Sequence, residues 1–115
     1  MVSVIIPAHN EEAFIGKCLD SLSKQTLEKK FFEVIVINNA SKDDTVKVAR
    51  KYDVHVINEE KKSVVLARQK GVDASKGEII VSADADTVYP ANWRKKIKAD
   101  FDKNKELIAV VGWID

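Results

Sequence analysis

The chain has 115 residues, of which 45% are hydrophobic and 32% charged, an ordinary composition for one globular domain. Its 19 basic and 18 acidic residues leave a net charge of +1, which gives no electrostatic basis for binding nucleic acid. No apolar run is long enough to form a transmembrane segment, and the start of the chain lacks a signal-peptide pattern. The single cysteine, Cys18, fits a reducing compartment, so we expect a cytoplasmic protein.

The first strand and helix are predicted from an apolar run followed by helical periodicity. Residues 2–6 should form a buried strand that Pro7 closes. Asn10 is a good N-cap, and the two glutamates after it would suit the positive end of the helix dipole. The helix should end near Gln25. Its apolar residues recur at helical spacing, which places the cysteine in the core: Phe14, Ile15, Cys18, Leu19 and Leu22.

The next two strands are predicted at 34–37 and 54–57. The first of them has no polar alternation, so both of its faces should be covered. His55 lies in the middle of the second, and we interpret it as a structural residue. Between the strands, Ser41 and Asp44 resemble a capping box at the start of a second helix.

A third helix should begin at its cap, Ser63. Ala67 and Gly71 place small residues on one face of this helix, which would let a neighbouring element approach closely. Pro90 suits the first position of a fourth helix, and residues 107–111 should form a fifth strand.

The fourth strand, 79–81, ends shortly before two carboxylates, Asp84 and Asp86. Residues i and i+2 of an extended chain project to the same side, so these side chains can converge on one point. Like charges held that close repel unless a cation lies between them, and Mg²⁺ or Mn²⁺ prefers such oxygen ligands. The alternative is a solvated turn before the next helix.

Strands that alternate with helices predict an α/β fold: a three-layer sandwich around a mostly parallel sheet of about five strands, in one domain over 1–115. In such a sheet, ligands bind at the carboxyl ends of the strands. The chain has neither a GxGxxG motif nor a P-loop there, which disfavours a dinucleotide site and an NTPase. That absence points to a diphosphate held by a metal and basic side chains.

Four blocks of the sequence, at 3–11, 33–45, 67–71 and 77–86, follow one another at fitting spacing. Together they resemble the N-terminal half of a family-2 glycosyltransferase with the GT-A fold. The resemblance implies a strand order of 3-2-1-4 plus a fifth strand. It also implies that the chain binds a nucleoside-diphosphate sugar for transfer to an acceptor.

By this resemblance, Pro7, His9 and Glu11 line the nucleoside pocket and Asn39 faces the base. The family commonly has Asp at the last of these positions. A carboxamide can still accept a hydrogen bond through its oxygen but is neutral, which leaves the base identity open.

The resemblance assigns the diphosphate side of the site to Arg68 and to the DxD motif formed by Asp84 and Asp86. The two aspartates would bridge ribose, diphosphate and a metal, Mn²⁺ or Mg²⁺. Without the resemblance, Arg68 would be interpreted as a solvated surface charge and His9 as a loop residue.

Family enzymes continue into an acceptor-binding half that supplies a catalytic base, and no residue here matches that base. The alternative function is therefore a non-catalytic nucleotide-binding or interaction module. A receiver-type signalling domain is disfavoured because it needs an acidic pair after the first strand. We also expect the edge of the fourth strand to be open or to be covered by the fifth; an open edge beside Trp113 and Ile114 would favour a weak homodimer.

Overall fold

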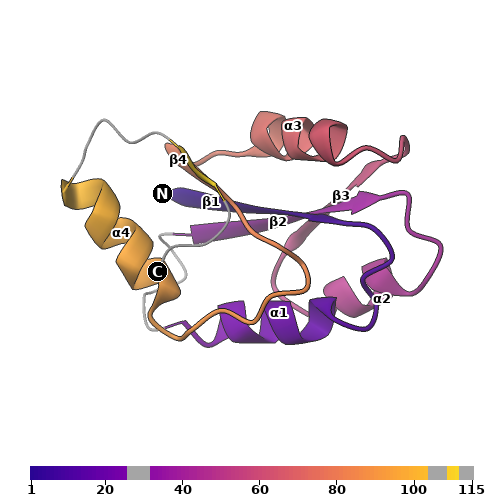
Figure 1. Ribbon diagram of the computed structural model, residues 1–115, viewed down its shortest axis with the longest axis horizontal. Helices are drawn as coiled ribbons and strands as arrows, with labels where there is room; N and C mark the ends of the chain where they lie inside the picture. The colour runs from indigo at the N-terminus through magenta and orange to yellow at the C-terminus, as the bar shows by residue number, and fades with distance from the viewer. Residues whose placement is uncertain (26–31, 104–108, 112–115) are drawn as a thin grey trace.

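The computed structural model describes residues 1–25, 32–103 and 109–111, which form a five-stranded sheet with helices on both faces (Figure 1). The strands are β1 (Val2–Ala8), β2 (Phe32–Asn39), β3 (His55–Glu59), β4 (Ile79–Ser82) and β5 (Ala109–Val111). They lie in the order β3-β2-β1-β4-β5, and each neighbouring pair is parallel. The predicted α/β sandwich and its strand order are confirmed.

The helices are α1 (Ile15–Ser23), α2 (Thr45–Ala49), α3 (Val64–Ala74) and α4 (Trp93–Lys103). Figure 1 shows α3 alone on one face of the sheet and the other three helices on the opposite face. The larger core cluster lies on the three-helix side and includes Cys18, Leu22, Trp93 and Ile97. The smaller cluster, under α3, consists of Ile5, Ile35, Ile37 and Ala67. The inner strand β2 contributes residues to both clusters and is thus covered on both faces, as its unbroken apolar run predicts.

Helix α3 lies very close to the sheet because small residues face it. A Cβ added to Gly71 would lie 2.8 Å from Ile37 Cδ1 and 3.1 Å from Ile5 Cβ, so no larger residue fits without movement. Ala67 is fully buried on the same face. The predicted cap is also present, since Ser63 Oγ accepts the N–H of Leu66 at 3.2 Å. This packing fixes the helix whose first turn borders the site.

The predicted starts of the first two helices are wrong, because their capping residues bond to each other's loops. Asn10 has a φ of 52°, and its Oδ1 accepts the N–H of Lys42 at 2.8 Å. Ser41 Oγ accepts the N–H of Asn10 at 2.9 Å instead of capping its own helix. A turn at Glu11 therefore precedes α1, which begins at Ile15, and Phe14 is exposed.

The fourth helix begins at Trp93, three residues later than Pro90 predicts. The carbonyl oxygen of Pro90 instead accepts hydrogen bonds from the N–H of Trp93 at 3.0 Å and from Gln25 Nε2 at 2.8 Å. Pro90 therefore ends the preceding loop. None of the described helices is long and apolar enough to cross a membrane.

Strand β5 pairs with β4 through Ile80–Ser82, so β4 has a neighbour on both sides. The open edge that would favour a homodimer through β4 is therefore not present. Trp113 and Ile114, which entered the same argument, lie outside the described residues, and the homodimer itself stays a prediction.

Candidate functional site

Two adjoining cavities lie where β1, β2 and β4 end. The first, of about 300 Å³, is lined by Pro7, Ala8, His9, Glu11, Asn39, Lys62, Ser63 and Val64. The second, of about 310 Å³, is lined by Pro7, Glu11, Val64, Arg68, Asp84, Ala85 and Asp86. Pro7, Glu11 and Val64 border both, so the two form one cleft. All seven residues predicted for the site line it.

The side chain of Asn39 is almost fully engaged within the protein. Its Nδ2 donates to the carbonyl oxygens of Glu59 (3.2 Å) and Lys61 (2.6 Å), and its Oδ1 accepts the N–H of Ser63 at 3.0 Å. Only 4% of the residue is exposed. Asn39 therefore ties the end of β2 to the turn between β3 and α3, which forms one wall of the first cavity. A single lone pair of Oδ1 is left for a ligand.

The imidazole ring of His9 is fixed by two contacts. Its Nδ1 lies 2.6 Å from the carbonyl oxygen of Asn39, and a carbonyl only accepts, so Nδ1 carries a hydrogen. Its Nε2 lies 3.3 Å from Nδ2 of Asn10 and is the acceptor in the neutral ring. The ring is half-buried and lines the first cavity.

Negative charge gathers in the second cavity. Along residues 83–86 the alanines are buried and the aspartates exposed, and Asp84 and Asp86 both line this cavity, so the two carboxylates do share a side. Across the cavity, burial together with the charges of Asp86 and Asp43 raises the pKa of Glu11. Arg68 is the cation that borders this cavity, and its side chain is exposed.

The acidic pair fits a hard divalent cation, although the protein does not supply a complete coordination shell. Carboxylate oxygens are suitable ligands, and repulsion between the carboxylates would be relieved by a cation. Within the described part of the chain, no three His, Cys, Asp or Glu side chains come close enough to hold a metal on their own. Mg²⁺-type ions commonly complete their shells with substrate phosphates and water, so a bound diphosphate would have to contribute ligands.

Sequence analysis missed the wall formed by Lys62, Ser63 and Val64. The signal was available, because this turn follows β3 at the same edge of the sheet. It also missed Tyr89, which is buried behind the acidic loop and whose hydroxyl accepts the N–H of Asp84 at 2.8 Å. An aromatic residue in a loop gives no such signal in the sequence.

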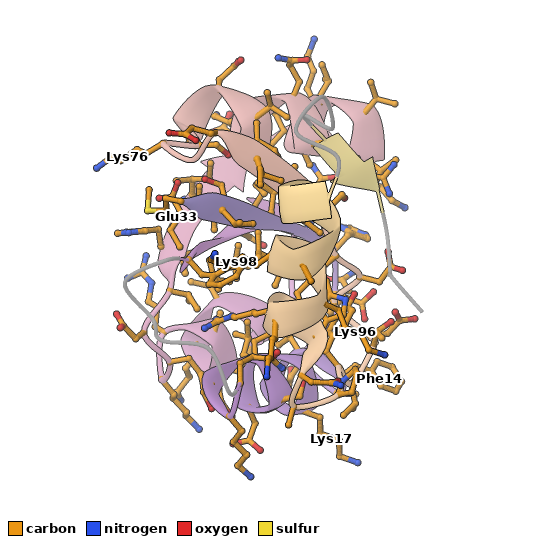
Figure 2. The ribbon with its side chains drawn as sticks, turned by 90° about the vertical axis from the view of Figure 1, so that its left-hand side faces the viewer. Phe14, Lys17, Glu33, Lys76, Lys96 and Lys98 are labelled. Atoms are coloured by element: carbon orange, nitrogen blue, oxygen red, sulfur yellow. The ribbon has the colours of Figure 1, made fainter. Side chains whose placement is uncertain are left out.

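A smaller cavity of about 150 Å³ lies at the opposite ends of the strands and contains none of the predicted site residues. Its lining includes Glu33, His55 and Arg94, whose guanidinium carbon lies 5.1 Å from the centre of the Phe32 ring. Figure 2 views the molecule from this end, with α4 in front and Glu33 near Lys76, whose N–H it accepts at 2.6 Å.

Comparison with known proteins identifies similar chains. The sequence model described as Glycosyl transferase family 2 matches residues 3–115. Glycosyltransferase AglE of Haloferax volcanii is 35% identical over 101 residues, which are 83% of this chain and 33% of that protein. The chain thus spans about a third of the length of this relative.

Solved structures of the GT-A fold superpose well. Residues 1–349 of Staphylococcus aureus TarS in complex with UDP match with a TM-score of 0.84 and 28% identity, over 90% of this chain and 32% of that one. Mannosyltransferase PcManGT from Pyrobaculum calidifontis, in complex with GDP-Man and Mn²⁺, matches with a TM-score of 0.70 and 31% identity, over 78% of this chain and 28% of that one.

Proposed function

Since the chain belongs to glycosyl transferase family 2, we propose that it binds a nucleoside-diphosphate sugar as the donor for transfer of the sugar to an acceptor. The observation that supports this most directly is the two-part cleft. One part has a mixed apolar and polar lining that suits a nucleoside, and the adjoining part carries the acidic pair and Arg68. Pro7, Glu11 and Val64 would lie at the junction.

The nucleoside would occupy the first cavity. Pro7, Val64 and the ring of His9 offer apolar surface to the base and ribose, and Glu11 offers its carboxylate to hydroxyls. Asn39 would meet the base only through the remaining lone pair of its oxygen, because its other hydrogen-bonding capacity is used. Because Asn39 offers the base only one acceptor, this pocket fits either UDP or GDP. Solved structures with UDP and with GDP-Man are both similar to this chain.

The diphosphate would lie in the second cavity. A Mn²⁺ or Mg²⁺ ion held by Asp84 and Asp86 would supply charge that stabilises the departing diphosphate. Arg68 would pair with phosphate oxygens on the opposite wall, since a guanidinium can donate to two of them at once. We assign no described residue as the general base that would deprotonate the acceptor.

The test is a titration of the 115-residue chain with UDP, GDP and TDP sugars, with Mg²⁺ or with EDTA, followed by amide chemical shifts. We expect metal-dependent shifts at residues around both cavities, and we then expect Mn²⁺ to broaden the amides near Asp84 and Asp86. If none of the nucleotides perturbs the cleft with metal present, the proposal is wrong. Tight metal-dependent binding with no sugar transfer to an acceptor would instead favour the non-catalytic module.

A further inference from the structure

Four hydrogen bonds form a closed circuit between α1 and the loop that carries the acidic pair. The N–H of Asp84 donates to Tyr89 Oη at 2.8 Å, and the N–H of Tyr89 donates to Ser21 Oγ at 2.9 Å. Ser21 Oγ in turn donates to the carbonyl oxygen of Cys18 at 2.6 Å. Cys18 Sγ closes the circuit by donating to the carbonyl oxygen of Asp84 at 3.5 Å. Both backbone polar groups of Asp84 are therefore bonded to buried side chains.

The three side chains that hold the Asp84 backbone are buried, which limits competition from water. Cys18, Ser21 and Tyr89 are 0%, 8% and 4% exposed. The Tyr89 ring packs on Trp93, with ring centres 4.2 Å apart and planes at 38°, so its hydroxyl has little freedom to move. Burial raises the pKa of Tyr89 to about 12, which keeps the phenol neutral. Figure 1 shows the same loop running beside α1 before it turns back to α4.

We infer that Tyr89 is a positioning residue for the metal-binding pair: it fixes the backbone of Asp84 and so sets where the Asp84 and Asp86 carboxylates lie. This inference rests on the proposed function of the same site. Two carboxylates on a short loop repel each other, and a loop without an anchor would relax by separating them. The anchor holds the pair in the arrangement that a cation needs before the cation arrives, which reduces the reorganisation that binding requires.

Tyr89→Phe is the decisive variant, because it keeps the ring and its packing on Trp93 and removes only the hydroxyl, which accepts the Asp84 N–H and also contacts the Thr87 side chain. We expect Mn²⁺-dependent affinity for UDP to fall about 5- to 10-fold, the size of one net hydrogen bond, with metal-free UDP binding unchanged. Tyr52→Phe is the matched control, since Tyr52 is half-buried and lines the small cavity at the opposite ends of the strands. It should change neither quantity.

Amide hydrogen exchange gives a readout that does not depend on metal. Asp84 should exchange faster in Tyr89→Phe than in the wild type or in Tyr52→Phe. If the tyrosine variant does not fold, Ser21→Ala breaks two other bonds of the circuit, those to Tyr89 and Cys18, and should weaken Mn²⁺-dependent binding in the same direction. Unchanged Mn²⁺ affinity in whichever of these variants folds would overturn the inference.

The wild-type titration separates this inference from the proposed function. If the wild-type chain shows no metal-dependent binding of any of the nucleotides tested above, the proposed function fails and the positioning role fails with it. If the wild type binds and Tyr89→Phe binds equally well, only the positioning role is wrong.

Discussion

At the carboxyl end of β2 the side chain of Asn39 makes three hydrogen bonds within the protein. At the end of β4, in contrast, the side chains of Asp84 and Asp86 are exposed, with one long hydrogen bond from Thr87 Oγ1 to Asp86 at 3.5 Å, and it is the backbone of Asp84 that buried groups hold. The first arrangement uses a polar side chain to shape a wall. The second uses buried residues to hold a backbone whose charged side chains have few hydrogen-bonding partners within the protein. We therefore expect the first region to contribute to the stability of the fold and the second to contribute to ligand binding.

The physical reason for the difference is burial. A buried amide must have its hydrogen bonds satisfied, so Asn39 binds three backbone groups and becomes part of the fold. Exposed carboxylates remain hydrated and are not forced to find partners in the protein. Changes at Asn39 should affect unfolding, and changes at the acidic pair should affect ligand binding with the fold intact.

The largest expected effect is on binding, in Asp86→Asn. Loss of residues that only support a metal ligand typically weakens binding about 10- to 100-fold, so loss of a direct ligand should reduce Mn²⁺-dependent UDP affinity by roughly 100-fold or more. The melting temperature should stay the same or rise slightly, because repulsion with Asp84 and Glu11 is relieved. Calorimetric titration and thermal unfolding measure the two effects. Asp73→Asn, an exposed carboxylate on α3, is the control, and equal UDP binding in both variants would contradict the metal site.

The second prediction concerns Asn39→Asp, which should affect stability. A carboxylate would face the carbonyl oxygens of Glu59 and Lys61 with no hydrogen to donate, which should cost about 2–3 kcal/mol of unfolding free energy. Denaturant unfolding checks this. Asn58→Asp adds the same charge nearby and keeps its oxygen as the acceptor for Asn38, so it should be close to neutral. If Asn39→Asp is as stable as that control, the structural role of the carboxamide is refuted.

A smaller effect is expected for Gly71→Ala, which tests the close approach of α3. The added methyl group would lie 2.8 Å from Ile37 Cδ1, and overpacking of this kind costs about 1–3 kcal/mol, partly offset by the better helix propensity of Ala. We expect a net loss of about 1 kcal/mol in denaturant unfolding and a shift of the Val64 wall visible in amide spectra. Ala74→Gly, at the exposed end of the same helix, is a useful reference for propensity alone.

Periodicity predicted the elements of the fold because it reports burial directly. The strand cores, the small face of α3 and the position of Cys18 all follow from which residues avoid water. The helix starts failed for a different reason. Asn10 and Ser41 each have the right chemistry for a cap, but each found a partner about 30 residues away in the chain, and local sequence carries no information on such a contact.

For the candidate site, too, the sequence predicted the residues but not the buried contacts that hold them. The resemblance selected seven residues that the fold brings to one cleft, and the i, i+2 spacing correctly predicted that Asp84 and Asp86 share a side. That Asn39 faces a nucleobase stays a prediction. Its hydrogen bonds to the 59–63 turn could not be predicted from the sequence, because they depend on how β3 and α3 meet. The support that Tyr89 gives to Asp84 likewise depends on a buried contact that spacing does not reveal.

The last prediction uses Glu11→Gln to measure how much the partly buried charge of Glu11, next to Asp86, destabilises the folded protein. Burial and the nearby charge of Asp86 raise the pKa of Glu11 in the folded protein above its ordinary value. The folded state therefore binds this proton more tightly than the unfolded state, and the stability that this provides at low pH is lost as the pH rises through the raised pKa. Glutamine removes the penalty, so the stability of Glu11→Gln relative to the wild type should grow as the pH rises from below the ordinary pKa of a glutamate through the raised pKa, and then stay constant. Thermal unfolding of both proteins across this range measures the gain, with Glu60→Gln, an exposed glutamate outside the cleft, as the control. Mn²⁺ with UDP should shrink the gain, because a bound cation would screen the same repulsion. A difference in stability that does not change with pH would show that the carboxylates of this cavity do not interact.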